Sequence, residues 1–192
     1  MISLARDFAI ETTSRHTLLP ILDRHIQQSK QHERYIALVT CQFQEFRETN
    51  INLGYAIGNK IIQDTFQRLE DIVRESNCLF RTGPCEFVLI LPFLASPSVA
   101  EIAANKVCNA LKDVYLIDAH SLHMAPKIGV AVSGDSGIDA DRFSLLSEDA
   151  LLQAKNNLRV RQLFSECLHC FLRYVAAAEK EHIQLAQSDQ GQ

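Results

Sequence analysis

The sequence predicts an α+β fold, a ferredoxin-like α/β sandwich in which helices flank a central mixed, mostly antiparallel sheet. The order of local patterns is the first reason: helix, strand, helix, strand, strand, helix, strand, helix. Two βαβ-like halves that meet in one sheet produce this order. Composition predicts a single globular domain, because 192 residues with 47% hydrophobic and 22% charged side chains suffice for one domain with a complete core.

The first half of the chain is expected to supply two helices around a buried strand. Apolar positions at helical spacing predict a helix over residues 16–30, and the run RYIALVTCQF predicts a buried strand over 34–43. Residues 44–60 mix turn formers with a helical pattern. The clearest helix is predicted over 59–76, where one apolar stripe contains Ile61, Ile62, Phe66, Leu69, Ile72 and Val73.

A hairpin and a helix follow. Strands are predicted over 78–82 and 87–92, on either side of the stretch RTGPCEF at 81–87. Its Gly-Pro pair is a turn signal, because Gly tolerates a positive φ and Pro fixes φ near about −65°. A helix over 99–114 is preceded by Ser-Pro-Ser at 96–98, which offers a hydroxyl as its N-cap.

The last part of the chain predicts one or two strands over 116–133 and a helix over 141–157. We expect the domain itself to occupy residues 1–160. An amphipathic helix over 161–183 can then pack back on the domain, form a dimer seam or lead to a neighbouring domain. The closing residues 184–192 have the composition of a disordered tail.

Charge and composition exclude several classes of protein. The net charge of −4 and the pI of about 6.0 argue against broad nucleic-acid and anionic-membrane binding and leave a local basic pocket as an alternative. Apolar runs are too short to span a bilayer, and charges interrupt the first 16 residues, unlike a signal peptide. We therefore expect a cytoplasmic protein with reduced core thiols.

Two small groups of residues offer little chemistry on their own. Cys167 and Cys170 form a lone CxxC pair that lacks the second pair of a typical zinc site. His120 and His123 lie close together without a partner acid, which favours surface positions. No Ser-His-Asp or phosphate-loop pattern is found in the sequence.

Four motifs in the correct order resemble the GGDEF domain family, the diguanylate cyclases of bacterial cyclic-di-GMP signalling, and cover about residues 10–160. RTGPCEFVLILP is similar to R-Y-G-G-(D/E)-E-F and its following strand, giving a GPCEF signature. KIGVAVS and SEDALLQAKNNLR resemble two later family motifs. CQFQEFRETNINLGYAIGN resembles D-x-D-x-F-K-x-x-N-D-x-x-G-H-x-x-G-D. The resemblance implies a nucleotide-cyclase-like sandwich. Only Arg15 keeps the register of the family's opening motif.

The departures from the family pattern fall at its metal ligands. The family holds Mg²⁺ with two carboxylates, and the corresponding positions here are Gln42 and Cys85, with Gln44 at the second Asp of D-x-D. Mg²⁺ prefers charged oxygen ligands, whereas sulfur suits softer metals. Phosphoryl transfer depends on charge neutralisation at that metal. Pro84 also removes a backbone donor from the turn. The resemblance thus implies a degenerate domain without catalytic residues, metal or cofactor, in which Glu86 is a residual acid.

Other positions retain parts of the family's nucleotide site. Asn50 and Asn59 match residues that bind guanine, and Lys155 and Arg159 match residues that contact phosphates. Arg74 matches the Arg of the family's R-x-x-D product-inhibition site and is a candidate cyclic-di-GMP contact, although Asn77 replaces the Asp. The alternative is that these are solvated helix charges and turn residues.

Three functions follow from these observations. The first is a catalytically inactive GGDEF domain that regulates, senses nucleotide or binds a partner protein or neighbouring signalling domain, with GTP or cyclic-di-GMP as ligands. The second is a divergent cyclase that uses Glu86 and Glu45 as substitute Mg²⁺ ligands. The third is a structural homodimerisation domain that binds no nucleotide. We expect no nucleic-acid and no membrane partner.

Overall fold

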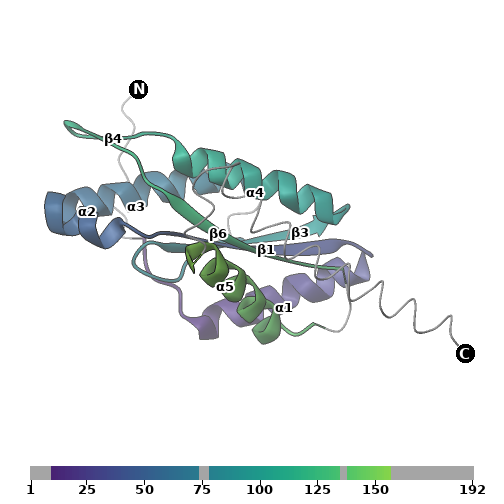
Figure 1. Ribbon diagram of the computed structural model, residues 1–192. Coiled ribbons are helices and arrows are strands. Elements are labelled where there is room, and N and C mark those ends of the chain that lie inside the picture. Colours follow the sequence, from purple (N-terminus) through teal and green to yellow (C-terminus); the bar gives the residue numbers. More distant parts are fainter. Residues whose placement is uncertain (1–9, 74–77, 135–137, 157–192) are drawn as a thin grey trace, which may run out of the picture.

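The computed structural model describes residues 10–73, 78–134 and 138–156 (Figure 1). In chain order the elements are α1 (Arg15–Gln31), β1 (Tyr35–Phe43), α2 (Phe46–Leu53), α3 (Tyr55–Glu70), β2 (Leu79–Arg81), β3 (Glu86–Leu94), α4 (Pro97–Lys112), β4 (Tyr115–Ile117), β5 (His120–Leu122), β6 (Pro126–Ser133) and α5 (Ala140–Asn156). Within these ranges no helix is long and apolar enough to cross a bilayer.

The central sheet has the strand order β2-β3-β1-β6. Each strand pairs with its neighbours in antiparallel fashion, and Gln42 near the end of β1 lies opposite Glu86 on one side and Lys127 on the other. This order is that of the split βαβ arrangement of ferredoxin-like folds. The predicted α+β class and mostly antiparallel sheet are confirmed, and the described pairings are all antiparallel.

The strands are buried on both faces because helices cover both (Figure 1). Alternate residues of β1 point to opposite faces of a pleated strand. Val39 and Cys41 pack in a cluster with residues of α3 and α4, while Ile36 and Leu38 pack in a second cluster with residues of α1 and α5. The near-continuous apolar run that predicted a buried strand reflects these two cores.

Helix α5 lies against the sheet at a glycine. A Cβ built at Gly129 of β6 would stand 2.3 Å from the backbone nitrogen of Leu151 and 2.4 Å from the carbonyl oxygen of Ser147. The Ser147 hydroxyl lies 2.7 Å from the Thr40 hydroxyl and donates to the carbonyl of Leu38. The absence of a side chain at Gly129 therefore allows the backbone of α5 to approach the strands.

Two predicted element boundaries are wrong. The helix predicted over 59–76 begins at Tyr55 and ends at Glu70, and a separate α2 precedes it. The helical pattern of residues 44–60 is divided at Gly54, whose φ of 86° ends one helix and begins the next. Residues 116–133 contribute to three strands instead of one or two, because β4 and β5 form a small hairpin sheet of their own.

Helix α3 holds this hairpin through Arg68. The guanidinium donates to the carbonyls of Ala110, Asp113 and Val114, which lie at and just after the end of α4. It also lies 3.9 Å from the ring centroid of Tyr115, the first residue of β4. Carbonyls at a helix end lack partners within the helix, so Arg68 satisfies them and anchors β4 with one side chain.

The cysteines follow the prediction where the structure describes them: Cys41, Cys78, Cys85 and Cys108 are buried and form no disulfide. Cys167 and Cys170, the predicted helix over 161–183 and the predicted tail over 184–192 lie outside the described residues.

Candidate functional site

The two positions at which the sequence predicted lost metal ligands meet in the structure. Gln42 lies near the end of β1, and Cys85 lies in the turn that leads into β3. The Cys85 thiol donates to the backbone carbonyl of Phe43 at 3.2 Å, and the Gln42 side chain hydrogen-bonds the same thiol. The site therefore contains a neutral amide and a neutral thiol that contact each other, and the thiol also bonds the Phe43 carbonyl.

The electrostatic environment keeps the thiol protonated. Burial raises the pKa of Cys85, which is partly offset by hydrogen bonding with the Phe43 backbone and the Gln42 side chain; the Glu86 carboxylate also raises this pKa, and the positive charge of Lys155 on α5 lowers it. Burial also raises the pKa of the neighbouring Cys41, with smaller contributions from Glu86 and Cys85. A thiolate, the form that binds metals, is thus disfavoured at neutral pH.

The residues at this site do not fit Mg²⁺. Mg²⁺ demands near-octahedral oxygen coordination with carboxylates among its ligands, whereas Gln42 supplies one neutral oxygen and Cys85 a protonated sulfur. Within the described ranges no three His, Cys, Asp or Glu side chains are grouped closely enough to hold a metal ion.

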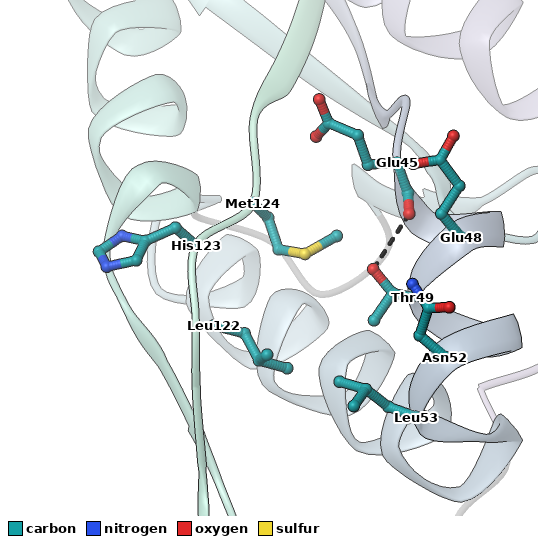
Figure 2. Close-up of a pocket in the computed structure, with 8 residues that line it drawn as sticks. All are labelled: Glu45, Glu48, Thr49, Asn52, Leu53, Leu122, His123 and Met124. Carbon is teal, nitrogen blue, oxygen red and sulfur yellow. Dashed lines mark hydrogen bonds between the residues drawn. The ribbon is translucent and has the colours of Figure 1, made fainter.

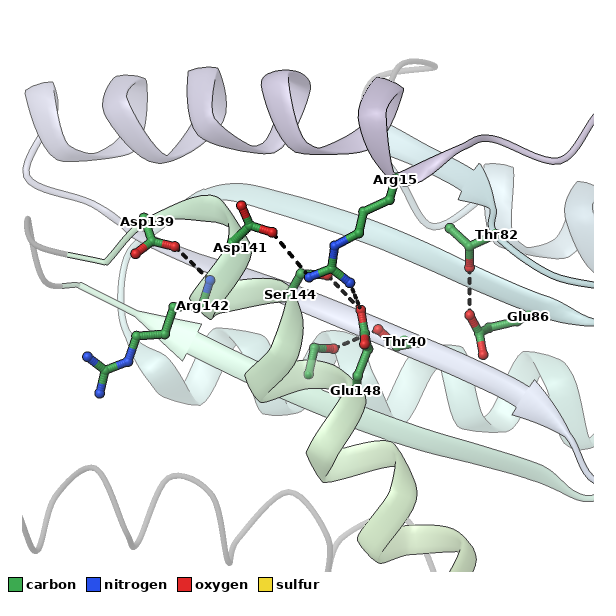
Figure 3. A network of polar contacts seen from close by, with 10 residues as sticks. Arg15, Thr40, Thr82, Glu86, Asp139, Asp141, Arg142, Ser144 and Glu148 are labelled. Atoms are coloured by element: carbon green, nitrogen blue, oxygen red, sulfur yellow. Dashed lines mark hydrogen bonds and ion pairs between the residues drawn. The ribbon is translucent and has the colours of Figure 1, made fainter.

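The two acids considered as substitute ligands lie in different surroundings. The Glu86 carboxylate accepts a hydrogen bond from the Thr82 hydroxyl at 2.8 Å (Figure 3). Glu45 lines a surface pocket together with residues of α2 and of the β5–β6 connection (Figure 2). Cys85 does not line that pocket, so the geometry offers no shared metal position for the two carboxylates.

Arg81 fixes the shape of the turn formed by Gly83, Pro84 and Cys85 (the GPC turn). The sequence analysis did not assign this role. The Arg81 guanidinium donates to the carbonyls of Gly83 at 3.0 Å, Pro84 at 2.8 Å and Ile10 at 2.8 Å. Its own carbonyl accepts from the backbone of Thr13. Burial lowers the pKa of Arg81. The only sequence feature that could have indicated this contact is the position of Arg81 itself, a cationic residue directly before the turn.

The α2–α3 corner brings the two predicted guanine-binding residues into one region. The Asn50 side-chain oxygen is buried and has no hydrogen-bond partner among the described residues. It lies so close to Gly58 that a Cβ there would stand 1.8 Å from it. Asn59, next in sequence to Gly58, is exposed. Gly58 thus makes room for the Asn50 amide, whose oxygen has no hydrogen-bond partner among the described residues.

Helix α5, which carries Lys155, is also joined to α1 by an ion-pair network (Figure 3). Arg15 contacts Glu148 at 2.9 Å and Asp141 at 3.3 Å, and Ser144 donates to the same Glu148 carboxylate. Because Arg15 is 43% exposed, these pairs contribute little stability. Their geometry positions the start of α1 against α5.

The structure describes some of the remaining residues from the sequence analysis and leaves others outside its described ranges. His120 and His123 are exposed, as expected, and Phe87 is buried in the core. Arg74, Asn77 and Arg159 lie outside the described residues.

Comparison with known proteins gives one consistent result. The family model for "Diguanylate cyclase, GGDEF domain" matches residues 5–161. The chain is 27% identical over 150 residues to the diguanylate cyclase TpbB of Pseudomonas aeruginosa, covering 74% of this chain and 34% of TpbB. It is 25% identical over 145 residues to the bifunctional diguanylate cyclase/cyclic di-GMP phosphodiesterase MucR of the same species, covering 76% of this chain and 21% of MucR. The chain thus spans about a third or less of these relatives.

Solved structures share the fold. The GGDEF domain of TpbB, also called YfiN, superposes with a TM-score of 0.72 at 23% identity, covering 80% of this chain and 90% of that domain. Diguanylate cyclase SiaD from P. aeruginosa, solved in complex with its activator SiaC, gives a TM-score of 0.68 at 22% identity, covering 80% of this chain and 58% of SiaD.

Proposed function

The chain belongs to the GGDEF domain family, and on this premise we propose that it is a catalytically inactive member that senses a guanine nucleotide and regulates a partner in cyclic-di-GMP signalling. The matched relatives are bacterial proteins that make or degrade cyclic di-GMP. The proposal concerns what this domain does with the part of the family site that it retains.

The Asn50 side-chain oxygen is the observation that supports nucleotide binding most directly. A buried acceptor without a partner costs about 1–3 kcal/mol, and this oxygen is buried against Gly58 without a partner among the described residues. The resemblance assigns this position to guanine, whose N1–H and N2–H groups are donors that an amide oxygen can accept. If the Asn50 side chain turns toward a bound guanine, this oxygen gains the partner that it lacks among the described residues.

Loss of catalysis follows from the chemistry at Gln42 and Cys85. Neither residue supplies the negative oxygen that Mg²⁺ needs, and the Cys85 proton is already donated to the Phe43 carbonyl. Removing even one preorganised stabilising group costs about 10²–10³ in rate. We therefore expect no measurable synthesis of cyclic di-GMP from GTP.

The same substitutions predict that nucleotide binding does not require a divalent metal. Lys155 lies near enough to Cys85 to affect its pKa, and its ammonium can pair directly with a phosphate. Mg²⁺ bound to the nucleotide would compete with Lys155 for the same oxygens. GTP should therefore bind at least as well in EDTA as in Mg²⁺.

Calorimetric titration with GTP and guanosine, each in Mg²⁺ and in EDTA, tests the proposal. Loss of one hydrogen bond at Asn50→Ala should weaken both ligands by about two- to tenfold, while the melting temperature stays equal or rises because an unsatisfied atom is removed. Lys155→Gln should weaken GTP and leave guanosine unchanged. Asn109→Ala and Lys106→Gln on exposed positions of α4 are the matched controls.

Two results would contradict the proposal. Robust formation of cyclic di-GMP on incubation with GTP and Mg²⁺ or Mn²⁺ would show an active cyclase. Absence of both a calorimetric signal and a thermal shift with GTP and with cyclic di-GMP would favour a structural dimerisation domain, because a ligand that binds the native state raises its apparent stability.

A further inference from the structure

A pocket of about 290 Å³ lies between α2 and the segment that connects β5 to β6 (Figure 2). Glu45 and Glu48 stand on its α2 side, and the apolar part of its lining consists of Leu53, Leu122 and Met124. The pocket shares no lining residue with the site around Gln42, Cys85, Asn50 and Lys155. It therefore needs an explanation separate from nucleotide binding.

The two carboxylates of the pocket lie at the start of α2 and have no cationic side-chain partner in the described part of the chain. No salt bridge of the described residues reaches Glu45 or Glu48. The Thr49 hydroxyl donates to the backbone carbonyl of Glu45 and leaves the carboxylate available (Figure 2). His123 is exposed, and its ring points away from both acids. The pocket thus combines negative charge with an apolar wall.

Size and chemistry restrict what can occupy such a pocket. Anions are repelled by the two carboxylates, and no grouping of metal-ligating side chains occurs in the described part of the chain. The volume lies at the lower limit of about 300–1,000 Å³ for small-molecule sites. Glu48, Asn52 and His123 are exposed, so the pocket opens to the surface. A single cationic side chain with an apolar stem matches all of these properties.

We propose that the pocket binds an arginine side chain presented by a partner protein. Arginine fits better than lysine because its planar guanidinium has five donors and can bridge two carboxylates, and because it is less strongly hydrated. The guanidinium would lie between Glu45 and Glu48. Its methylene groups would pack on Leu122 and Met124, as long cationic side chains commonly do on apolar surfaces.

Methionine labelling gives a direct test, because the chain contains two methionines, Met1 and Met124. In the full chain labelled with [ε-¹³C]methionine, titration with N-acetyl-L-arginine methylamide should shift the Met124 signal saturably and leave Met1 unchanged. The neutral isostere N-acetyl-L-citrulline methylamide should shift it far less. The lysine analogue should bind more weakly than the arginine probe.

Charge-neutralising variants complete the test. Glu45→Gln and Glu48→Gln should each weaken the arginine probe by about two- to fivefold, the size of one partly exposed ion pair. Glu70→Gln, an exposed acid at the end of α3, is the matched control and should leave the affinity unchanged. The proposal is overturned if Met124 does not respond, if citrulline binds equally well, or if Glu70→Gln has the same effect. Because the two sites share no residues, such a result would leave the nucleotide proposal standing.

Discussion

Replacement of Gly129 by alanine tests whether the backbone of α5 lies directly on the sheet. The added Cβ would stand 2.3 Å from Leu151 N, 2.4 Å from the Ser147 carbonyl oxygen and 2.8 Å from Leu151 Cα, whereas real Cβ contacts essentially never fall below 3.0 Å. All three atoms belong to a helix backbone, which cannot rotate away as a side chain can. The helix must therefore move outward from β6.

The cost of this movement can be bounded from the contacts that it disturbs. Overpacking a close-packed interface costs about 1–3 kcal/mol, and the buried hydrogen bond between Thr40 and Ser147 is worth about 1 kcal/mol more if it is stretched beyond use. A domain of this size loses about 2–4 °C of melting temperature per kcal/mol. We expect Gly129→Ala to melt about 2–15 °C below the wild type.

Thermal unfolding followed by circular dichroism measures the effect, with two other glycines as controls. At Gly83 a Cβ would meet only the Cβ of Glu86, at a tight 3.2 Å, and no helix backbone, so Gly83→Ala should destabilise the fold less than Gly129→Ala does. At Gly54 no atom lies within 4 Å but φ is 86°, so Gly54→Ala isolates backbone strain of about 1–3 kcal/mol. A wild-type melting temperature for Gly129→Ala would refute the close approach of α5.

Three further predictions concern the GPC turn and the residues around it. Because burial raises the pKa of Cys41 and Cys85, the folded chain keeps protons that unfolded thiols release near about pH 8.5. The free energy of unfolding should therefore fall above that pH, by up to about 1.4 kcal/mol per pH unit for each thiol. The urea midpoint should accordingly fall between about pH 7.5 and about pH 9.5, and Cys41→Ala should make this fall smaller. Arg81→Met should cost about 1–3 kcal/mol and speed amide exchange across the turn, whereas Arg34→Met, at an exposed position, should do neither. Gln42→Asp combined with Cys85→Glu should make GTP binding depend on Mg²⁺; equal affinities with and without the metal would contradict the assignment of these positions.

The sheet could be predicted because its main strands have clear local sequence patterns. The apolar run of β1 and the hairpin around Gly83 and Pro84 have strong local signals, and their pairing follows from the ferredoxin-like order. The α2–α3 division was missed because a helical pattern continues through Gly54, and only its positive φ reveals the break. The β4–β5 hairpin was missed because each of its strands has only three residues, too short for a periodic pattern.

The site was predictable where its residues belong to motifs and hidden where it depends on contacts between distant segments. Gln42 and Cys85 were identified by register and do meet in space. The Cys85–Phe43 hydrogen bond joins two residues that are far apart in the sequence. The same is true of the Arg81–Ile10 contact, and no sequence motif indicates either one. The pocket beside Glu45 combines α2 with a segment that follows it by about seventy residues, and no local pattern connects the two.

The two attachments between α3 and the β4–β5 hairpin have a mechanical consequence. Arg68 donates a hydrogen bond to the Val114 carbonyl, directly before the hairpin begins. Lys60, about two turns earlier on the same helix, forms an ion pair with Asp118 at the hairpin tip. The hydrogen bonds of Arg68 account for most of this attachment, because the Lys60–Asp118 pair is exposed and contributes little stability on its own. We therefore expect the pocket wall that contains Leu122 to move together with α3.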